Sequence, residues 1–256
     1  MKALYDKFGW PALIAATFAV GLAVLLVATI RFVAIFVWRR KRYVPDYKAD
    51  RAELGRSVFW SLVSMAGNAV LMFPIQLGIV KGYSRMYFSV GEYGWLYLPF
   101  SAVALLAVSE TLTYWVHRVL HSRFLYGLHA KHHEFKKTTP LMAVAFIPLD
   151  AFLQGLPYHL CIYAFPIHVW VYQGFFVCIT LWAISIHDRT TWLAPKGLLV
   201  WLVNHTGCHT VHHWFGTGNF GQITSIWDRI CGTYKHPQDL PAEFFAAVPG
   251  RAPPPA

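Results

Sequence analysis

Histidines carry the clearest chemical signal in this 256-residue chain, because nine of its thirteen fall in two short windows. The first window holds the motifs HRVLH and HAKHH, and the second ends in CHTVHH. Side chains three or four residues apart share one face of a helix, so each motif can direct two or three imidazoles toward one point. The candidate metal ligands are His117, His121, His129, His132, His133, His209, His212 and His213.

The number of histidines indicates two metal ions. Eight neutral imidazoles gathered at membrane depth are costly to bury unless metal satisfies their nitrogen lone pairs. One zinc ion takes four ligands, or three and a water molecule, so eight ligands are too many for a single ion. Imidazole suits iron, zinc, copper and nickel, and the motifs alone leave the metal open. Neither HRVLH nor HAKHH contains the glutamate of HExxH, which argues against a zinc-dependent hydrolase.

A glycine pattern follows the last histidine motif. Gly216, Gly218 and Gly221 match the GxGxxG pattern of dinucleotide-binding proteins. The required strand before the pattern and the acidic residue that contacts the ribose are both missing. We therefore predict a tight loop that returns the chain toward Trp227.

The composition indicates a membrane protein. Hydrophobic residues make up 56% of the chain and charged residues 13%, about half the charged share of soluble domains. The net charge of +10 is concentrated in short clusters such as RRKR at residues 39–42, which favours a membrane surface over nucleic acid as the partner. The four cysteines form no CxxC pair and are expected to be reduced thiols.

Four hydrophobic stretches must position the histidines: residues 12–38, 58–80, 98–116 and 152–186. Arg31, near the end of the first, is expected to extend its charge toward the membrane interface. The fourth stretch contains Pro157 and Pro166, which favours a hairpin of two short or tilted helices. We predict an all-α membrane protein of about four transmembrane helices or hairpin segments, with a helical cap that holds a dinuclear metal site.

The basic loop at residues 39–56 predicts the orientation, because positively charged loops stay in the cytoplasm. The third stretch then returns to the cytoplasmic side, and all histidine motifs can meet in one cytoplasmic cap. The predicted organisation is an N-terminal membrane region at 1–97, a catalytic domain at 98–240 and a proline-rich flexible tail at 241–256.

The motifs resemble those of the fatty acid hydroxylase/sterol desaturase superfamily. Within it the chain looks most like the sterol C5-desaturases, also called lathosterol oxidases or Δ7-sterol 5(6)-desaturases. That narrower resemblance rests on longer matches in family order between residues 81 and 237: KGYSRMY, VGEYG, FIPLDAFLQGLPYH, ISIHD and NFGQITSIWDRICGTYKHP.

The resemblance implies a non-haem diiron enzyme with two Fe ions and O2 as co-substrate, which introduces a C5=C6 double bond into a Δ7-sterol. It carries the ligand role over to the eight motif histidines and to His187 in ISIHD, and it names no catalytic residue beyond the ligands. Electrons are expected from a separate donor, cytochrome b5-like or a ferredoxin with its reductase. The expected location is the endoplasmic reticulum or the bacterial inner membrane.

Other interpretations stay open. The chain could be a lipid hydroxylase of the same superfamily, acting on a sphingoid base, a fatty acyl chain or a methyl sterol, or a non-catalytic membrane protein that binds metal. The family usually has histidines where Val144 and Ile147 stand, which leaves the substrate open.

Several residues near the motifs have open roles. Asp188 and Asp228 are expected to orient ligand N–H groups, with a salt bridge to Arg229 or another nearby cation as the alternative for Asp228. Whether His205 or His159 joins the site is not decided by the sequence.

Overall fold

The computed structural model describes residues 1–45, 47–190 and 199–237, and most of them are in helices. The N-terminal part contains α1 (Lys2–Phe8), α2 (Trp10–Phe32), the π-helix η1 (Val33–Trp38) and α3 (Arg40–Tyr43). It continues with α4 (Arg51–Leu71) and α5 (Phe73–Val80). Asp50 caps α4 by accepting from the backbone N–H groups of Ala52 and Glu53, so this helix begins seven residues before the predicted stretch.

The helices that carry most of the site follow two short elements, β1 (Met86–Tyr87) and η2 (Val90–Glu92). They are α6 (Tyr97–Leu120), α7 (Tyr126–His133), the 3₁₀ helix η3 (Pro140–Val144), α8 (Pro148–Ala164) and α9 (Val169–Ile186). Strand β2 (Ile167–His168) lies between α8 and α9 and pairs in parallel with β1. The hairpin predicted from Pro157 and Pro166 is therefore confirmed, and its break falls after Ala164.

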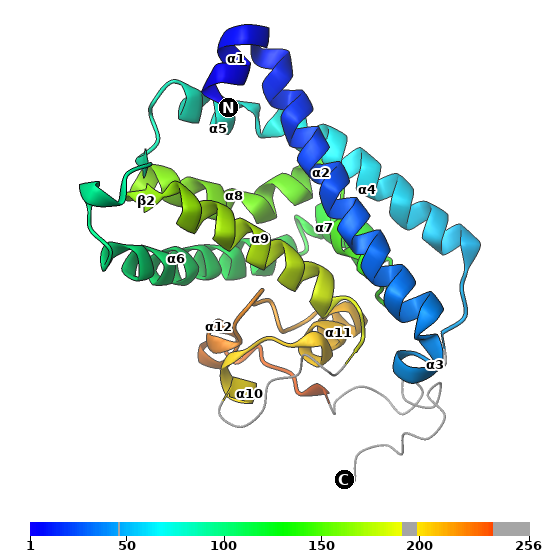
Figure 1. Ribbon diagram of the computed structural model, residues 1–256. Coiled ribbons are helices and arrows are strands. Elements are labelled where there is room, and N and C mark those ends of the chain that lie inside the picture. Colours follow the sequence, from blue (N-terminus) through cyan, green and yellow to red (C-terminus); the bar gives the residue numbers. More distant parts are fainter. Residues whose placement is uncertain (46, 191–198, 238–256) are drawn as a thin grey trace.

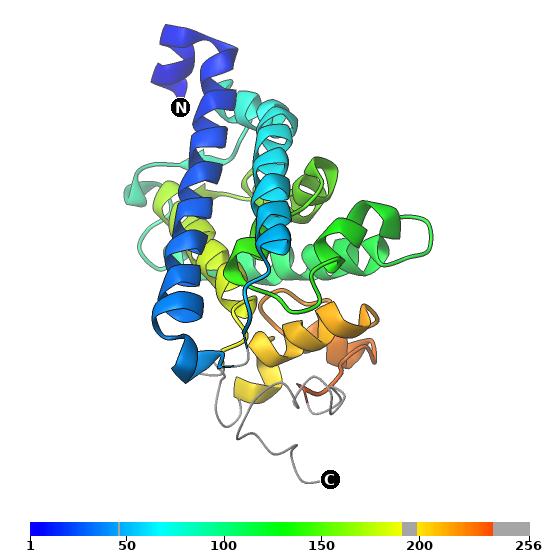
Figure 2. The same cartoon turned by 90° about the vertical axis from the view of Figure 1, so that its right-hand side faces the viewer.

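The last described helices are α10 (Leu199–Leu202), α11 (Thr206–Phe215) and α12 (Ile226–Ile230). In Figures 1 and 2, α2 and α4 run side by side, and α10 to α12 form a lobe at the end of the molecule where α3 lies. The predicted flexible tail at 241–256 lies outside the described residues.

Three described segments are long and apolar enough to cross a membrane: Trp10–Trp38, Tyr97–Leu120 and Val169–Ile186. The pair α4 and α5, bent by 43°, would make a fourth. The prediction of an all-α membrane protein with about four such segments is confirmed, although only α9 of the hairpin qualifies as a span. Apolar side chains such as Leu26 and Ile30 are exposed on α2, as contact with lipid requires.

Close packing joins the N-terminal helices to the rest of the fold. Helix α4 contacts the start of α8 at Gly67, where a Cβ atom would lie 2.4 Å from two carbon atoms of the Pro148 side chain. At this position glycine allows an approach that any larger residue would prevent.

Candidate metal centre

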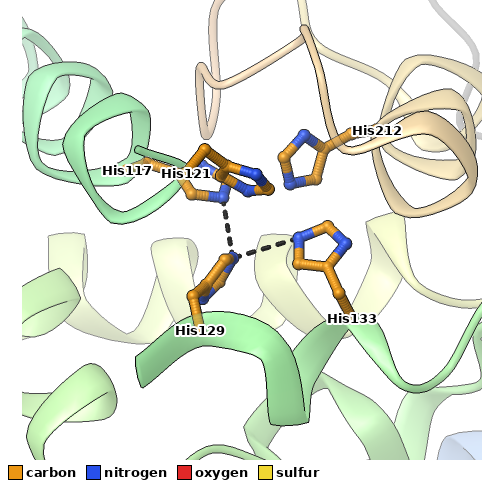
Figure 3. A group of neighbouring side chains, drawn as sticks. All are labelled: His117, His121, His129, His133 and His212. Carbon is orange, nitrogen blue, oxygen red and sulfur yellow. Dashed lines mark hydrogen bonds between the residues drawn. The ribbon is translucent and has the colours of Figure 1, made fainter. Parts of the chain in front are cut away.

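Nine buried or half-buried histidines come together in two groups at the junction of α6, α7, α9 and α11. Within each group, one candidate ligand atom from every residue lies within 4.8 Å of all the others. Group one, shown in Figure 3, contains His117, His121, His129, His133 and His212. Group two contains His132, His187, His209 and His213. Every histidine that the sequence analysis named as a ligand is in one of the groups.

His205 and His159 are in neither group. The His205 side chain caps α11 by accepting from the backbone N–H of Gly207. His159 is paired through Nδ1 with the Tyr172 hydroxyl at 2.5 Å, between α8 and α9.

Each HxxHH motif directs two of its rings to one group, as its spacing predicted, and its third ring to the other group. On α7, His129 and His133 enter group one while His132 enters group two. On α11 the division is reversed, since only His212 enters group one. Positions i+3 and i+4 lie on opposite sides of position i, about 100° apart around the helix axis, so the adjacent histidines of each motif point to different groups. Two helices that face each other therefore build two sites.

Three rings of group one have a fixed tautomer. Nδ1 of His117 donates to the Phe220 carbonyl at 2.8 Å, and Nδ1 of His212 donates to the Gly218 carbonyl at 2.7 Å. Nδ1 of His129 donates to the Asp150 carboxylate at 2.7 Å. Carbonyl and carboxylate oxygens only accept, so each Nδ1 carries the proton and each neutral ring presents a lone pair at Nε2.

The spacing of these lone pairs fits a metal ion. Nε2 of His117 and Nε2 of His129 are 3.2 Å apart (Figure 3). Two lone pairs at this distance cannot hydrogen-bond to each other, and a cation between them would satisfy both. The Nε2 atom of His133 is 3.1 Å from the same His129 atom.

Fewer rings of group two have a hydrogen-bond acceptor that fixes their orientation. Nδ1 of His187 donates to the Ala183 carbonyl at 2.7 Å, and its Nε2 is 2.9 Å from Nε2 of His209. Among the described residues, neither ring nitrogen of His213 has a hydrogen-bond partner, nor does Nδ1 of His132. The His132 ring stacks on Phe146 with 4.1 Å between ring centroids.

Burial keeps these rings neutral. It lowers the pKa of His132, His133, His209, His212 and His213 well below the usual value. It also lowers the pKa of His121 to about 3 and that of His187 to about 4. A neutral imidazole is the form that binds metal, and unpaired buried nitrogens are costly without a partner. The two groups therefore fit bound metal ions.

Buried carboxylates support the ligands, and the sequence analysis missed two of them. Asp150 is fully buried and accepts from Gln154 as well as from His129. Glu110, within α6, accepts from three successive backbone N–H groups, those of residues 222–224. For Glu110 the available signal was an acidic residue inside the apolar segment 98–116, whereas Asp150 stands just before the segment 152–186 and had no such signal.

The two predicted supports act indirectly. Asp228 accepts from the backbone N–H groups of Phe220 and Gly221, and so fixes the loop whose carbonyl holds His117. The alternative salt bridge to Arg229 is not formed, because Arg229 instead donates to the Trp201 carbonyl. Asp188 pairs with Arg31 and does not contact a ligand ring.

The glycine-rich segment forms the predicted tight loop. Gly216 ends α11 in the left-handed conformation at φ 67°. A Cβ atom on Gly218 or Gly221 would lie 2.3 or 2.1 Å from a backbone oxygen of Thr233 or Thr224. The glycines therefore let the loop pack closely against the backbone at Thr224 and Thr233, and in this loop the Gly218 carbonyl accepts from His212.

Both groups open onto one cavity of about 170 Å³. Histidines 117, 132, 187 and 209 line it together with residues of α6, α8 and α9 and with Gln222. Ala143 and Phe146 also line this cavity, whereas Val144 and Ile147 are not part of its lining.

The histidine groups lie in a part of the chain that matches a known protein family. Residues 102–233, slightly more than half of the chain, match the family model described as Fatty acid hydroxylase. The chain belongs to the fatty acid hydroxylase family. The matched range contains all nine histidines and the carboxylates Glu110, Asp150 and Asp228, and it excludes α2 and α4.

Curated relatives of this fatty acid hydroxylase family member have sterol-related names. Mouse lathosterol oxidase is 38% identical over 191 residues, 73% of this chain and 63% of the mouse protein. A Delta(7)-sterol 5(6)-desaturase of Aspergillus fumigatus is 34% identical over 83% of this chain and 62% of its own length. A Delta(7)-sterol 5(6)-desaturase of Schizosaccharomyces pombe is 33% identical over 88% of this chain and 66% of its own length. The chain thus spans a little under two thirds of these relatives, and no solved structure matches it.

Proposed function

We propose that this protein is an O2-dependent membrane diiron oxidase that acts on a lipid, and that it is a sterol C5-desaturase. The observation that carries the oxidase proposal is the pair of neutral histidine groups facing one cavity beside apolar helices. The choice of a Δ7-sterol rests on the names of the relatives.

Two Fe ions are proposed, one in each histidine group. Bound iron with O2 supplies the oxidising power that no amino-acid side chain has toward an unactivated C–H bond. The residues of the chain contribute orientation, because Asp150 and the carbonyls of Gly218 and Phe220 direct three Nε2 atoms into group one. The cavity contributes position, since the carbon that loses hydrogen must lie beside the histidines that line it.

The orientation in the membrane follows from charge. Helix α3 and its neighbour Arg39 carry the RRKR cluster at the same end of the molecule as α11 and α12 (Figure 1). By the positive-inside rule this end is proposed to face the cytoplasm. A separate electron donor, cytochrome b5-like or a ferredoxin with its reductase, would approach there, and the lipid would enter from the membrane between helices.

Expression in cells that accumulate Δ7-sterols tests the proposal. Mass spectrometry of the extracted sterols should show a product lighter by two hydrogens, absent with a His209→Ala variant. A product heavier by one oxygen would support the lipid hydroxylase alternative instead. A protein that consumes no O2 with sterols, sphingoid bases or fatty acyl lipids would support metal binding without catalysis.

A further inference from the structure

Among the nine histidines of the two groups, His121 alone reaches the surface of the protein. The other eight are buried, whereas His121 is half-buried. It is not among the residues that line the cavity, so its exposed edge faces outward and not toward the substrate. His121 directly follows α6, at the end of the segment Tyr97–Leu120 that is long and apolar enough to cross a membrane. Group one therefore has a contact with the outside that group two lacks.

Exposed aromatic residues from α7 and from the end of α11 come close to His121. Tyr126 on α7 is 39% exposed, and its ring centroid is 5.8 Å from that of His121 and 6.3 Å from that of His133. The end of α11 approaches the same ring, because a Cβ atom on Gly216 would lie 3.8 Å from Cε1 of His121. Phe215, the residue before Gly216, is also 39% exposed. Aromatic residues are enriched where proteins bind other proteins.

Cations accompany these rings. Arg123, two residues after His121, is exposed. Lys136 is also exposed, and its Nζ donates to two carbonyls at the end of α11, at 3.0 and 3.3 Å. Nζ of Lys235 lies 4.7 Å from the centroid of the Phe215 ring. We call the following five residues the His121 surface: Arg123, Tyr126, Lys136, Phe215 and Lys235.

Acidic residues of the same segments do not offset this charge. Residues 118–137 and 209–237 contain seven Lys and Arg residues but only two acidic residues, Glu134 and Asp228. Glu134 is engaged in ion pairs with Arg56 and Lys131. Asp228 is fully buried and accepts from backbone N–H groups. The described segments around His121 therefore carry a net positive charge, which attracts a partner with an acidic face.

The proposed reaction needs electrons from such a partner. Removing two hydrogens from a lipid with one O2 also consumes two electrons and two protons from solvent, and it yields the alkene and two water molecules. The side chains of the centre orient metal ions but supply no electrons, so a separate carrier must deliver them. Electron transfer slows steeply with distance, so the carrier must approach a ligand ring closely. Of the nine ligand rings, that of His121 permits this approach.

We propose that the His121 surface is the docking site of the electron donor, a small carrier protein with an acidic face, and that electrons enter the metal centre through group one. This inference rests on the proposed oxidation at the histidine groups and identifies where its partner binds. Lipid and donor can be bound at the same time, because the cavity and the His121 surface have no residue in common.

Anaerobic stopped-flow measurements test the docking site. The probe is the reduced soluble haem domain of a cytochrome b5, chosen for its acidic surface, and its oxidation by the iron-loaded protein is followed by haem absorbance. The second-order rate constant should fall at least about 10-fold when salt rises from about 50 to about 500 mM, because salt screens the attraction. At low salt, Arg123→Glu combined with Lys235→Glu should lower it at least about 10-fold.

A matched variant reverses two charges far from the His121 surface. Lys81 and Arg85 are exposed and stand in the segment that follows α5, away from α11 (Figure 1). Lys81→Glu combined with Arg85→Glu should keep the rate constant within about 2-fold of the wild-type value, although it changes the net charge equally. Dithionite, a small reductant that needs no docking site, should reduce the iron of every variant at the wild-type rate.

Three outcomes would overturn the inference. They are a rate constant that does not depend on salt, no haem oxidation by a protein whose iron dithionite reduces, and equal rate constants for the two double variants. The last result would leave the basic residues a role at the anionic membrane surface instead.

The same data separate this inference from the proposed function. If haem oxidation shows the expected salt and variant effects but no lipid is oxidised, the docking site stands and the oxidase proposal fails. If lipid is oxidised in cells while Arg123→Glu with Lys235→Glu accepts electrons at the wild-type rate, the oxidase proposal stands and the docking site is refuted.

Discussion

The two histidine groups have similar composition but are held in place differently. In group one, His117, His129 and His212 each donate from Nδ1 to a fixed oxygen. In group two, the described contacts provide such an acceptor for His187 alone. The His132 ring instead rests on Phe146, and the His213 ring stacks on His133 at 4.7 Å.

The two groups also differ in how much of the cavity they line. Group two provides three of the four histidines that line the cavity, and group one provides only His117. Fixed acceptors orient a metal ligand and raise its basicity, so group one should bind metal more tightly. Rings held by packing can adjust more easily, and here they lie where a substrate must be accommodated.

The largest effects should come from removing one ligand of each group. His129→Ala and His132→Ala should each lower lipid oxidation by at least about 100-fold and reduce bound iron from about two ions to about one for each chain. Metal analysis of the purified variants provides the measurement. His205→Asn is the matched control, because Asn can still cap α11. Wild-type oxidation by either alanine variant would refute the assignment of two metal sites.

Replacing Asp150 tests whether the fixed tautomer of His129 strengthens metal binding in group one. An Asp150→Asn side chain can turn its amide N–H toward His129 and favour the wrong tautomer. The iron of group one should then bind about 10-fold to 100-fold more weakly. The measurement is iron retained against graded chelator in a His132→Ala background, where group one holds the remaining ion. Asp6→Asn, at the exposed N-terminal end, is the control, and unchanged retention would show that Asp150 is not needed for binding.

Arg31 lies outside residues 102–233, the range that matches the family model, and it supports group two through Asp188. Its guanidinium pairs with Asp188, which directly follows His187 and is fully buried. The expectation that Arg31 extends its charge toward the membrane interface stays a prediction, to which the structure adds the pairing with Asp188. Breaking a buried ion pair leaves a charge without compensation, although Thr190 would still donate to Asp188.

Arg31→Met should accordingly lower the free energy of unfolding by roughly 1 to 3 kcal/mol and release the iron of group two before that of group one. Thermal unfolding and iron titration of the same samples measure both effects. Arg31→Lys keeps the charge and should lose less. Equal loss of both iron ions would indicate general destabilisation and not a specific support for His187.

The sequence predicted the members of the site but not their division. Spacing is a local property, and it places His129 and His133 on one face of α7 whatever surrounds them. Which group a ring enters depends on how α7 faces α11, which is a tertiary property. Asp150 was missed for the same reason, because only the packing of α8 against α7 brings it to His129, 21 residues away in the chain.

Hydropathy predicted the fold in a similar way. It located the apolar segments, and Pro166 marked the break between α8 and α9. It did not reveal the bend after Leu71, since α4 and α5 form one continuous apolar run in the sequence. The approach of Gly67 to Pro148 has no signature in either helix alone, because only packing decides which glycine faces a neighbour.

The smallest expected effect concerns Phe146, which supports His132 by packing alone. Phe146→Leu keeps an apolar side chain but removes the stacked ring, an interaction that contributes about 0.5 to 1.5 kcal/mol. Oxidation should fall about 2-fold to 10-fold, with group one's iron unaffected. Phe176→Leu changes the same cavity without a described ring contact to either histidine group, so it separates cavity size from stacking. If both variants lose the same activity, packing does not position His132, and group two must be held by its metal ion instead.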